Sequence, residues 1–394
     1  GSQVMHMLTV MIVGLAMGST VTIGQAVGAK NRTKSAACIG NTATLFMIAS
    51  LVLTLLLLFC VKPIVSLIST PTEAVAGTIT YLKICFIGIP FITAYNIISS
   101  IFRGLGDSKS PMYFIAVACV FNIALDYLFI GALNMGPAGA ALGTTISQTI
   151  SVIIALAIIR RHKTALGVSK SYFKLTKPIT APILKIGIPI ALQDGLIQIA
   201  FIVITVIANQ RGLTDAAAVG IVEKIISFLF LVPSSMLSTV SALGAQNIGA
   251  GKPQRAVQTL GYGITITVSF GIIIAVIMQF AADSVVSLFT PDQGVILSGG
   301  QYLRGYIWDC IFAGIHFCFS GYFCACGRSE ISFLHNITAI VCARIPGVYL
   351  TSKLFADTLL PMGLATAAGS LVSVTVCIVA FVVLRKKGKL PQRS

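Results

Sequence analysis

Apolar stretches of about twenty residues follow one another along nearly the whole of this 394-residue chain. A helix of about that length crosses the ~30 Å hydrocarbon core of a bilayer. With 27 Lys and Arg and 11 Asp and Glu, the chain also has too few charges for a water-soluble globule, in which about a quarter of residues are charged. We therefore expect an all-α polytopic membrane protein with eleven spans, at approximately 3–24, 36–61, 77–101, 112–132, 138–159, 183–210, 216–245, 256–281, 299–325, 331–351 and 361–384.

The formal net charge of +16 comes from cations that lie between the apolar stretches. Because they do not sit on a soluble domain, they argue against a nucleic-acid partner. Most of them fall in alternate loops and in the C-terminal tail, and positively charged loops stay on the cytoplasmic side of a membrane. We expect a multi-pass protein of the cell membrane, with the C-terminus in the cytoplasm and the lipid bilayer as a partner.

The chain repeats itself at an offset of 221 residues, which indicates internal duplication. The stretch GAQNIGAGKPQRA (244–256) echoes GQAVGAKNRTKSA (24–36), and YLR (302–304) echoes YLK (81–83). Further along, MGLATAAGSLVS (362–373) resembles GPAGAALGTTISQ (136–148) at a slightly larger offset. Residues that match at the offset of 221 are Gln25 and Gln246, Gly28 and Gly249, Phe102 and Phe323, and Gly106 and Gly327.

The repeat predicts two pseudo-symmetric six-helix bundles. The expected parts are an N-terminal bundle (1–160), a cytoplasmic basic linker (161–182), a C-terminal bundle (183–384) and a basic cytoplasmic tail (385–394). Six spans per copy is an even number, so both copies enter from the same side, as in parallel-repeat transporters. The counterpart of the span at 183–210 would lie before residue 1. We therefore expect about 11 of 12 helices, with the first helix missing.

Four acidic residues fall inside the expected spans: Asp126, Asp194, Glu223 and Asp309. An ionisable group at the centre of a membrane helix costs ~2.5–3.5 kcal/mol on insertion scales, so it usually faces an interior cavity and has a function. Asn122 precedes Asp126 by four residues, which places both on one helix face. This pair is our candidate ion-coupling site; the alternative is a structural Asn–Asp pair that locks helix packing.

Other in-span polar residues are candidates for a cavity or substrate site, namely Asp194 with Gln193 and Gln198, Asp309, Tyr95, Asn96 and Gln148. Such residues also hydrogen-bond neighbouring helices without any transport role, and that alternative stays open for each. For Glu223, which adjoins Lys224, a snorkelling interfacial pair is favoured. Snorkelling is also expected for Lys83 and Arg304. His316 and His335 are single histidines without ligand partners in the sequence, so no metal site is expected.

Four segments occur in order on the expected spans and loops: RGLGDSKSP (103–111), NIALDYLFI (122–130), GPAGAALGTTISQ (136–148) and AQNIGAGKPQRA (245–256). Together they resemble the multidrug and toxic compound extrusion (MATE) transporters, more the DinF-like than the NorM-like branch. The resemblance implies two six-helix bundles around a central cavity, and export of organic cations in exchange for H⁺ or Na⁺.

The chain also departs from this family pattern. The DinF-like branch has an acidic residue in its first helix, the helix expected to be missing here. The second copy has CACGR (324–328) where the first has RGLGD (103–107). Asp309 lies about one turn from the cation-binding acid of NorM-like members.

The main functional hypothesis is a secondary antiporter for small organic cations, with H⁺ or Na⁺ as the coupling ion and alternating access by rocking bundles. A lipid-linked precursor flippase of the same superfamily and a truncated, inactive transporter are the alternatives. An ATP-binding loop is not expected, because Gln246 and Pro253 break the G-x-x-x-x-G-K-[ST] pattern. An intramembrane enzyme would need an H-E-x-x-H or similar cluster, which the sequence lacks. We expect a monomer that is not an enzyme and has no cofactor beyond Na⁺.

Overall fold

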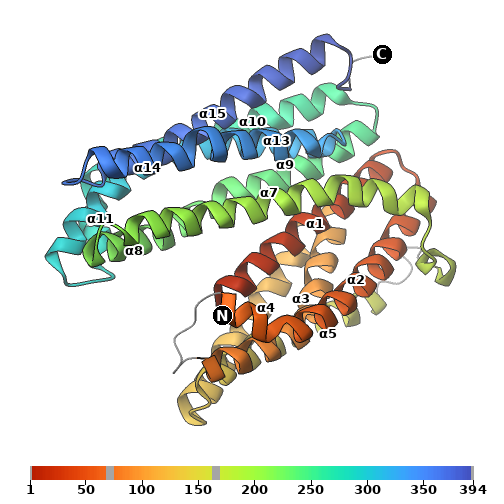
Figure 1. The fold of residues 1–394 in the computed structure, drawn as a ribbon. Coiled ribbons are helices and arrows are strands. Elements are labelled where there is room, and N and C mark those ends of the chain that lie inside the picture. Colours follow the sequence, from red (N-terminus) through yellow and green to blue (C-terminus); the bar gives the residue numbers. More distant parts are fainter. Residues whose placement is uncertain (1, 68–74, 162–168, 392–394) are drawn as a thin grey trace. The chain divides into compact units, whose positions relative to one another are not determined.

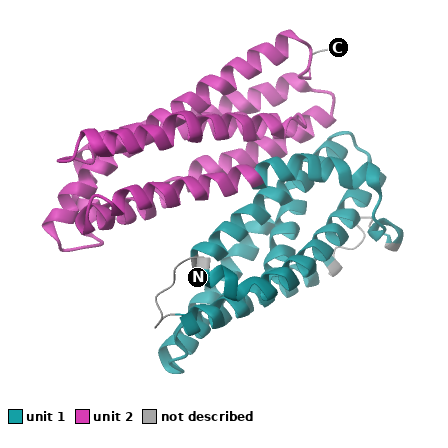
Figure 2. Ribbon diagram, viewed as in Figure 1, with its two compact units in different colours: residues 1–191 teal, residues 192–394 magenta. Residues whose placement is uncertain are grey.

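The computed structural model describes residues 2–67, 75–161 and 169–391, and every regular element in these residues is helical (Figure 1). The fold divides into two compact units, Gly1–Ala191 and Leu192–Ser394, and the division falls inside α7 (Lys177–Asn209) (Figure 2). The first unit contains α1 (Ser2–Gly28), α2 (Arg32–Leu67), α3 (Val75–Leu105), α4 (Lys109–Asp126), the π-helix η2 (Tyr127–Ala132), α5 (Gly136–Arg161) and the short 3₁₀ helix η3 (Lys170–Phe173).

The second unit follows the middle of α7. Its elements are α8 (Leu213–Leu229), α9 (Leu231–Gly249), α10 (Pro253–Ser287), α11 (Gln293–Tyr306), α12 (Asp309–Ala325), α13 (Ser329–Ala339), the π-helix η4 (Ile340–Arg344), α14 (Ile345–Leu354) and α15 (Leu360–Lys386).

Ten helical segments of the described chain are long and apolar enough to cross a membrane, and α11 with α12 makes an eleventh span that bends by 41°. The expectation of an all-α membrane protein with about eleven spans is therefore confirmed. The expected span at 216–245 comprises α8 and α9, which meet at Phe230. Phe59 on α2 and Phe280 on α10, 221 residues apart, are each 85% exposed. Such rings suit contact with lipid, where an apolar surface needs no cover.

The repeat reappears in the backbone at two pairs of turns. Lys30 and Gly251, 221 residues apart, both have positive φ, at 54° and 69°, and so do Gly106 and Gly327, at 89° and 71°. In all four turns the next residue donates its N–H to a carbonyl five residues back, as in the Schellman motif. These hydrogen bonds are Asn31 to Ala26 (3.0 Å), Lys252 to Asn247 (2.9 Å), Asp107 to Phe102 (2.9 Å) and Arg328 to Phe323 (2.8 Å).

Asp107 fixes the start of α4. Its Oδ1 accepts the backbone N–H groups of Lys109 (3.0 Å) and Ser110 (3.1 Å), and its Oδ2 accepts the Ser110 hydroxyl at 2.5 Å. Partial burial acts to raise the pKa of this carboxyl, but the Ser110 and Lys109 interactions outweigh it and lower the pKa. Its contribution to stability is present above the pKa of the unfolded carboxyl and is lost as the pH falls through the lowered folded pKa.

Glycines allow helices to cross closely within each unit. In the first unit, a Cβ on Gly18 of α1 would collide with the Ile183 carbonyl of α7, and one on Gly187 would collide with the Leu15 carbonyl of α1. In the second, Gly305 of α11 and Gly363 of α15 meet in the same reciprocal way. Small residues at such crossings let backbones approach, which is a main source of helix association in membranes.

The described part of the expected linker, residues 169–182, is tied to α2; residues 162–168 lie outside the described residues. Asn41 of α2 donates from Nδ2 to the Tyr172 carbonyl (3.0 Å) and accepts the Thr176 N–H at Oδ1 (2.8 Å). The Thr44 hydroxyl donates to the Phe173 carbonyl at 2.8 Å. Residues 172–176 are therefore a strap bonded across one end of α2, and we call them the strap below.

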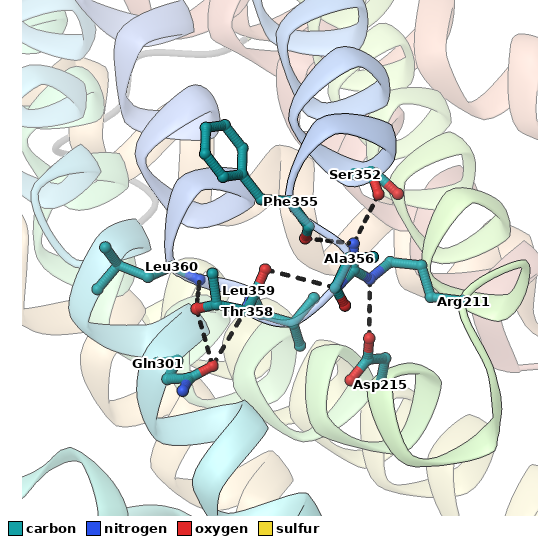
Figure 3. Close-up of polar contacts among 9 residues, drawn as sticks. All are labelled: Arg211, Asp215, Gln301, Ser352, Phe355, Ala356, Thr358, Leu359 and Leu360. Atoms are coloured by element: carbon teal, nitrogen blue, oxygen red, sulfur yellow. Dashed lines mark hydrogen bonds and ion pairs between the residues drawn. The ribbon is translucent and has the colours of Figure 1, made fainter.

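Arg211, in the turn between α7 and α8, holds the loop that follows α14 (Figure 3). Its Nε donates to Asp215 Oδ2 at 2.8 Å, and its side chain is only 8% exposed. The guanidinium nitrogens donate to the backbone carbonyls of Ser352 (2.7 Å), Phe355 (3.0 Å), Ala356 (2.8 Å) and Thr358 (3.4 Å). One planar side chain thus supplies donors to carbonyls at and beyond the end of a helix, where partners are otherwise lacking.

Replacement of this guanidinium should destabilise the second unit. We expect Arg211→Met to lower the free energy of unfolding by about 1.5–3 kcal/mol, because hydrogen bonds to a charged donor are lost together. Arg328→Met is the matched control, since Arg328 forms a more exposed pair with Glu330 at 3.2 Å; such pairs are worth ~0–1 kcal/mol. Thermal unfolding in detergent measures both. Equal losses for the two variants would contradict the role given to Arg211.

Candidate functional site

Asp126 and Asn122 lie on the last turn of α4 and face α5. A Cβ placed on Gly143 of α5 would collide with Asp126 Oδ1 and would stand 3.6 Å from Asn122 Nδ2. The expected shared face is therefore present. Immediately after Asp126 the helix widens into the π-helix η2, a local change often found at functional sites. Gly143 is what allows the two polar side chains to approach the backbone of α5.

The Asp126–Asn122 site has unused hydrogen-bonding capacity. Both residues are half-buried, yet Asp126 Oδ1 and Asn122 Nδ2 are buried atoms without a hydrogen-bond partner among the described residues. Leaving such a group unpaired costs about 1–3 kcal/mol. A proton on the carboxylate, or a cation held by the carboxylate and the amide oxygen after the amide turns over, would satisfy these atoms. The residues present therefore fit H⁺ or Na⁺.

The second unit has a cation beside the glycine that corresponds to Gly143. Gly369 of α15 matches Gly143 in the repeated segments 136–148 and 362–373. A Cβ on Gly369 would stand 2.7 Å from Arg344 Cβ, so the Cβ and backbone of Arg344 pack against this glycine, whereas at Gly143 the contact is made by the carboxylate of Asp126. Arg344 is the last residue of the π-helix η4, whereas Asp126 immediately precedes the π-helix η2. The two charges therefore lie beside matching glycines but do not match each other in the repeat, in which the residue 221 positions before Arg344 is Ile123.

Arg344 is neutralised inside its own unit by Asp309. Arg344 Nη2 lies 3.0 Å from Asp309 Oδ2 and donates to Ser370 Oγ at 2.8 Å. Asp309 is fully buried and Arg344 is 7% exposed. The residue 221 positions before Asp309 is Gly88, so the first unit has no acid at that position. Arg344 is the partner that the sequence interpretation missed.

Two buried tyrosines complete this polar region of the second unit. The hydroxyl groups of Tyr302 and Tyr306 have no hydrogen-bond partner among the described residues, and neither does Asp309 Oδ1. The tyrosine rings lie 5.5 Å apart between centroids. Because Arg344 already neutralises Asp309, a further cation is not needed there.

The candidate residues on α7 lie in the second unit. Gln193 is fully buried, and neither atom of its amide has a partner in the described part of the chain. Asp194 and Gln198 are half-buried and one turn apart. Asp194 lies within electrostatic reach of Cys324 on α12. Among the described residues, no hydrogen bond or ion pair joins these three to Asp309 or Arg344.

The remaining candidates belong to the first unit. Asn96 donates to the carbonyl of Ile92 in its own helix at 2.8 Å, which satisfies part of a buried amide locally. Tyr95 is half-buried and packs against a small apolar cluster with Phe114 and Val152. Gln148 on α5 is half-buried, and its Oε1 has no partner among the described residues. Within the described part of the chain, no hydrogen bond joins Asn96, Tyr95 or Gln148 to Asp126.

One expectation about the in-span charges is wrong, that of a Glu223–Lys224 pair. Glu223 does not pair with Lys224 at an interface: Lys224 is exposed, whereas Glu223 accepts the Thr205 hydroxyl at 3.3 and 3.2 Å. The reason is that adjacent residues point to different faces of a helix. The side chain of Arg304 forms an ion pair as well, with its Nη2 2.8 Å from Asp283 Oδ2 on α10; snorkelling of Arg304 stays a prediction. Lys83 shows no comparable ion pair within the described residues.

His335 connects three helices of the second unit. Its Nε2 lies 2.8 Å from Ser320 Oγ on α12, and its Nδ1 lies 2.9 Å from Ser373 Oγ on α15. Since Ser373 donates its hydroxyl to the His335 carbonyl (3.3 Å), it accepts from Nδ1–H, and Nε2 accepts from Ser320. His316 packs 5.5 Å away, measured between ring centroids. No three His, Cys, Asp or Glu side chains gather as a metal site within the described residues.

The buried ion pair leads to a prediction about stability. Asp309→Asn and Arg344→Met should each cost about 3–5 kcal/mol, because each leaves one buried charge without its partner. The double variant should cost clearly less than the sum of the two. Chemical unfolding in detergent measures the cycle. The more exposed pair Arg304 and Asp283 is the control, with an expected coupling of ~0.2–1 kcal/mol. Additive costs for Asp309 and Arg344 would contradict the pairing.

Comparison with known proteins places this architecture in a family. The MatE family profile matches residues 1–128 and 189–350. The chain is 28% identical over 309 residues to the probable multidrug resistance protein YoeA of Bacillus subtilis, an alignment that covers 77% of this chain and 67% of YoeA. It is 25% identical over 365 residues to the multidrug export protein MepA of Staphylococcus saprophyticus, covering 92% of this chain and 79% of MepA.

Comparison with solved structures also finds MATE proteins. A crystal structure of MATE in complex with MaL6 superimposes with a TM-score of 0.87 at 20% identity, covering 97% of this chain and 85% of that chain. At this identity the likeness concerns the fold. The family profile, which covers well over half of the residues, carries the assignment further: the chain belongs to the MatE family, the multidrug and toxic compound extrusion transporters.

Proposed function

We propose that this protein is a secondary antiporter that exports organic cations in exchange for H⁺ or Na⁺, with Asp126 as the coupling carboxylate. One observation carries the proposal. Asp126 has no cationic partner among the described residues, whereas Arg344, the charge beside the matching glycine of the second unit, is neutralised by Asp309. The first unit therefore has a membrane-embedded negative charge that a mobile cation can neutralise.

The physical basis of coupling is competition for this charge. A carboxylate with unpaired acceptors binds a proton or Na⁺ in one state and favours an organic cation in another. Each ligand shifts the equilibrium between states by its differential affinity, and coupling of this kind typically amounts to about 5- to 150-fold. Asn122 supports both states, because an amide can donate to a carboxylate and accept from a carboxylic acid.

The names of the relatives agree with this class of substrate, since YoeA and MepA are described as multidrug resistance and multidrug export proteins. Export of drug-like organic cations by this chain is part of the proposal, as are a monomeric state, a cell-membrane location and a cytoplasmic C-terminus. The DinF-like branch stays a prediction. A flippase for lipid-linked precursors would favour a cationic cavity for pyrophosphate. The buried cation Arg344 is already paired, so the geometry supports this alternative less.

The decisive experiment is Asp126→Asn in proteoliposomes containing the 394-residue chain. With the wild-type protein, efflux of an ethidium-like dye should follow an imposed pH gradient or an imposed Na⁺ gradient, and testing each gradient alone identifies the ion. In the variant, gradient-driven efflux should fall to the background of protein-free vesicles, because an amide cannot be protonated or carry the charge. Asp357→Asn is the control, since Asp357 is exposed in a loop.

Three outcomes would overturn the proposal. Normal efflux by the folded Asp126→Asn variant would remove Asp126 from the mechanism. Wild-type binding of lipid pyrophosphates without dye efflux would favour the flippase. Wild-type protein that neither binds nor moves dye would favour the inactive alternative. Unchanged thermal unfolding of the variant separates loss of coupling from loss of the fold.

A further inference from the structure

A large apolar pocket lies in the first unit, apart from Asp126. It has a volume of about 650 Å³ and lies between α2, α3 and α5, with Phe173 of the strap also in its wall. This volume falls in the range of small-molecule pockets, about 300–1,000 Å³. Phe91 and Leu156 in the wall are 40% and 48% exposed, so the pocket opens on the outer surface of the unit. Neither Asp126 nor Asn122 lines it.

Comparison of the two copies of the repeat shows that this fold can form with the pocket region filled by side chains. Ile98 and Ile101 line the pocket, and their counterparts 221 residues later are Phe319 and Tyr322. Both rings pack against Phe381 of α15, at centroid distances of 5.8 and 5.6 Å. At the larger offset shared by Gly143 and Gly369, Phe381 corresponds to Ala155.

The second unit therefore fills with three aromatic rings the region that stays open in the first. What remains beside Tyr322 is a pocket of about 260 Å³ next to Arg385. Both regions are closed at one end by the segment that follows the last helix of the copy. In the second unit, Leu390 is 3% exposed and joins the apolar cluster of Phe319 and Tyr322. In the first unit, Phe173 takes the comparable place, held by the hydrogen bonds of Asn41 and Thr44.

The lining and its surroundings point to one kind of occupant. All side chains in the wall are hydrocarbon or thioether, so a cationic ligand would lose its hydration without gaining a hydrogen bond. The strap end of the pocket is rich in positive charge: Lys174 follows Phe173 directly, Lys177 begins α7, and both side chains are exposed.

We propose that this pocket binds one acyl chain of an anionic phospholipid, whose headgroup phosphate is held by Lys174 and Lys177. The acyl chain gains dispersion contacts with side chains that otherwise face a void. The phosphate gains from the juxtaposed cations, as in basic pockets between membrane helices. A bound lipid would stabilise the contact of α2 with the strap. This site is independent of the transport proposal, because the two share no residue.

The test uses proteoliposomes with trace phosphatidylglycerol or phosphatidylcholine that carries a diazirine in one acyl chain. After photolysis, mass spectrometry of peptides locates the label. Label from phosphatidylglycerol should concentrate on pocket residues of α3 and α5. It should exceed that from phosphatidylcholine by about fivefold for each lysine engaged. In the double variant Lys174→Gln/Lys177→Gln, the ratio of phosphatidylglycerol label to phosphatidylcholine label should fall toward one. Labelling of the pocket itself should remain.

The double variant Ile98→Phe/Ile101→Phe tests the pocket itself. It places aromatic rings in the pocket at the positions that correspond to Phe319 and Tyr322 of the second unit. Phenylalanine is used at 101 because the partner of the Tyr322 hydroxyl, Cys326, corresponds to Leu105 here. Pocket labelling should fall to the level of the general lipid-facing surface. Ile115→Phe on the exposed face of α4 is the control and should change nothing. Unfolding temperatures verify that each variant is folded.

The proposal is wrong if pocket labelling persists in the filled variant or is equal for the two lipids. It is also wrong if an organic-cation dye, rather than lipid, displaces the label from α3 and α5. If the filled variant loses both the label and its fold, a second variant, Ile98→Val, tests the proposal, because it enlarges the pocket instead of filling it. Labelling of that variant should be retained or increased, and a decrease would contradict lipid binding there.

Discussion

The neutralisation of charge in an apolar solvent is the constraint on which the arrangement of this protein depends. A charge within the hydrocarbon region must be paired inside the protein, reach an interface or exchange ligands with water. The second unit uses the first solution, with Arg344 and Asp309 at 3.0 Å. The first unit leaves Asp126 with an unpaired oxygen against Gly143. Beside the matching glycines Gly143 and Gly369, the first unit therefore holds a carboxylate without an ion pair among the described residues, and the second unit holds an internal ion pair.

Duplication gave both units one framework, and their differences lie in side chains. Matching turns with positive φ recur at Lys30 and Gly251 and at Gly106 and Gly327, so the loops that set helix order are the same. Over this framework, Gly88 replaces Asp309, and two isoleucines replace Phe319 and Tyr322. The first substitution removes an internal counter-ion, and the second opens a pocket. If both proposed sites exist, a duplicated fold has gained them without a change of topology, because cores tolerate different fillings of the same space.

The sequence predicted the spans, the repeat and the shared face of Asn122 and Asp126, because each follows from local periodicity or self-comparison. It did not predict the partner of Asp309. Helical spacing tells which residues share a face, but Arg344 lies 35 residues away on another helix. An arginine inside a membrane span usually pairs with an acid. This rule predicts an acidic partner for Arg344, but it does not select one of the four acids inside the spans. The apolar pocket was equally hidden, since it appears only when three helices are packed.

A permanent pair and an exchangeable carboxylate differ in what they contribute to coupled transport. A ligand shifts a conformational equilibrium only if it binds the two states with different affinity. Arg344 is covalently part of the chain, so its concentration near Asp309 does not depend on the medium, and the pair cannot report an ion gradient. Asp126 has no such internal ligand among the described residues, so under the proposed mechanism its occupancy would follow the proton or sodium activity on whichever side it faces. Under the proposed mechanism, coupling would therefore belong to the first unit, while the second would provide a counterpart of the same fold in which the charges of Arg344 and Asp309 cancel.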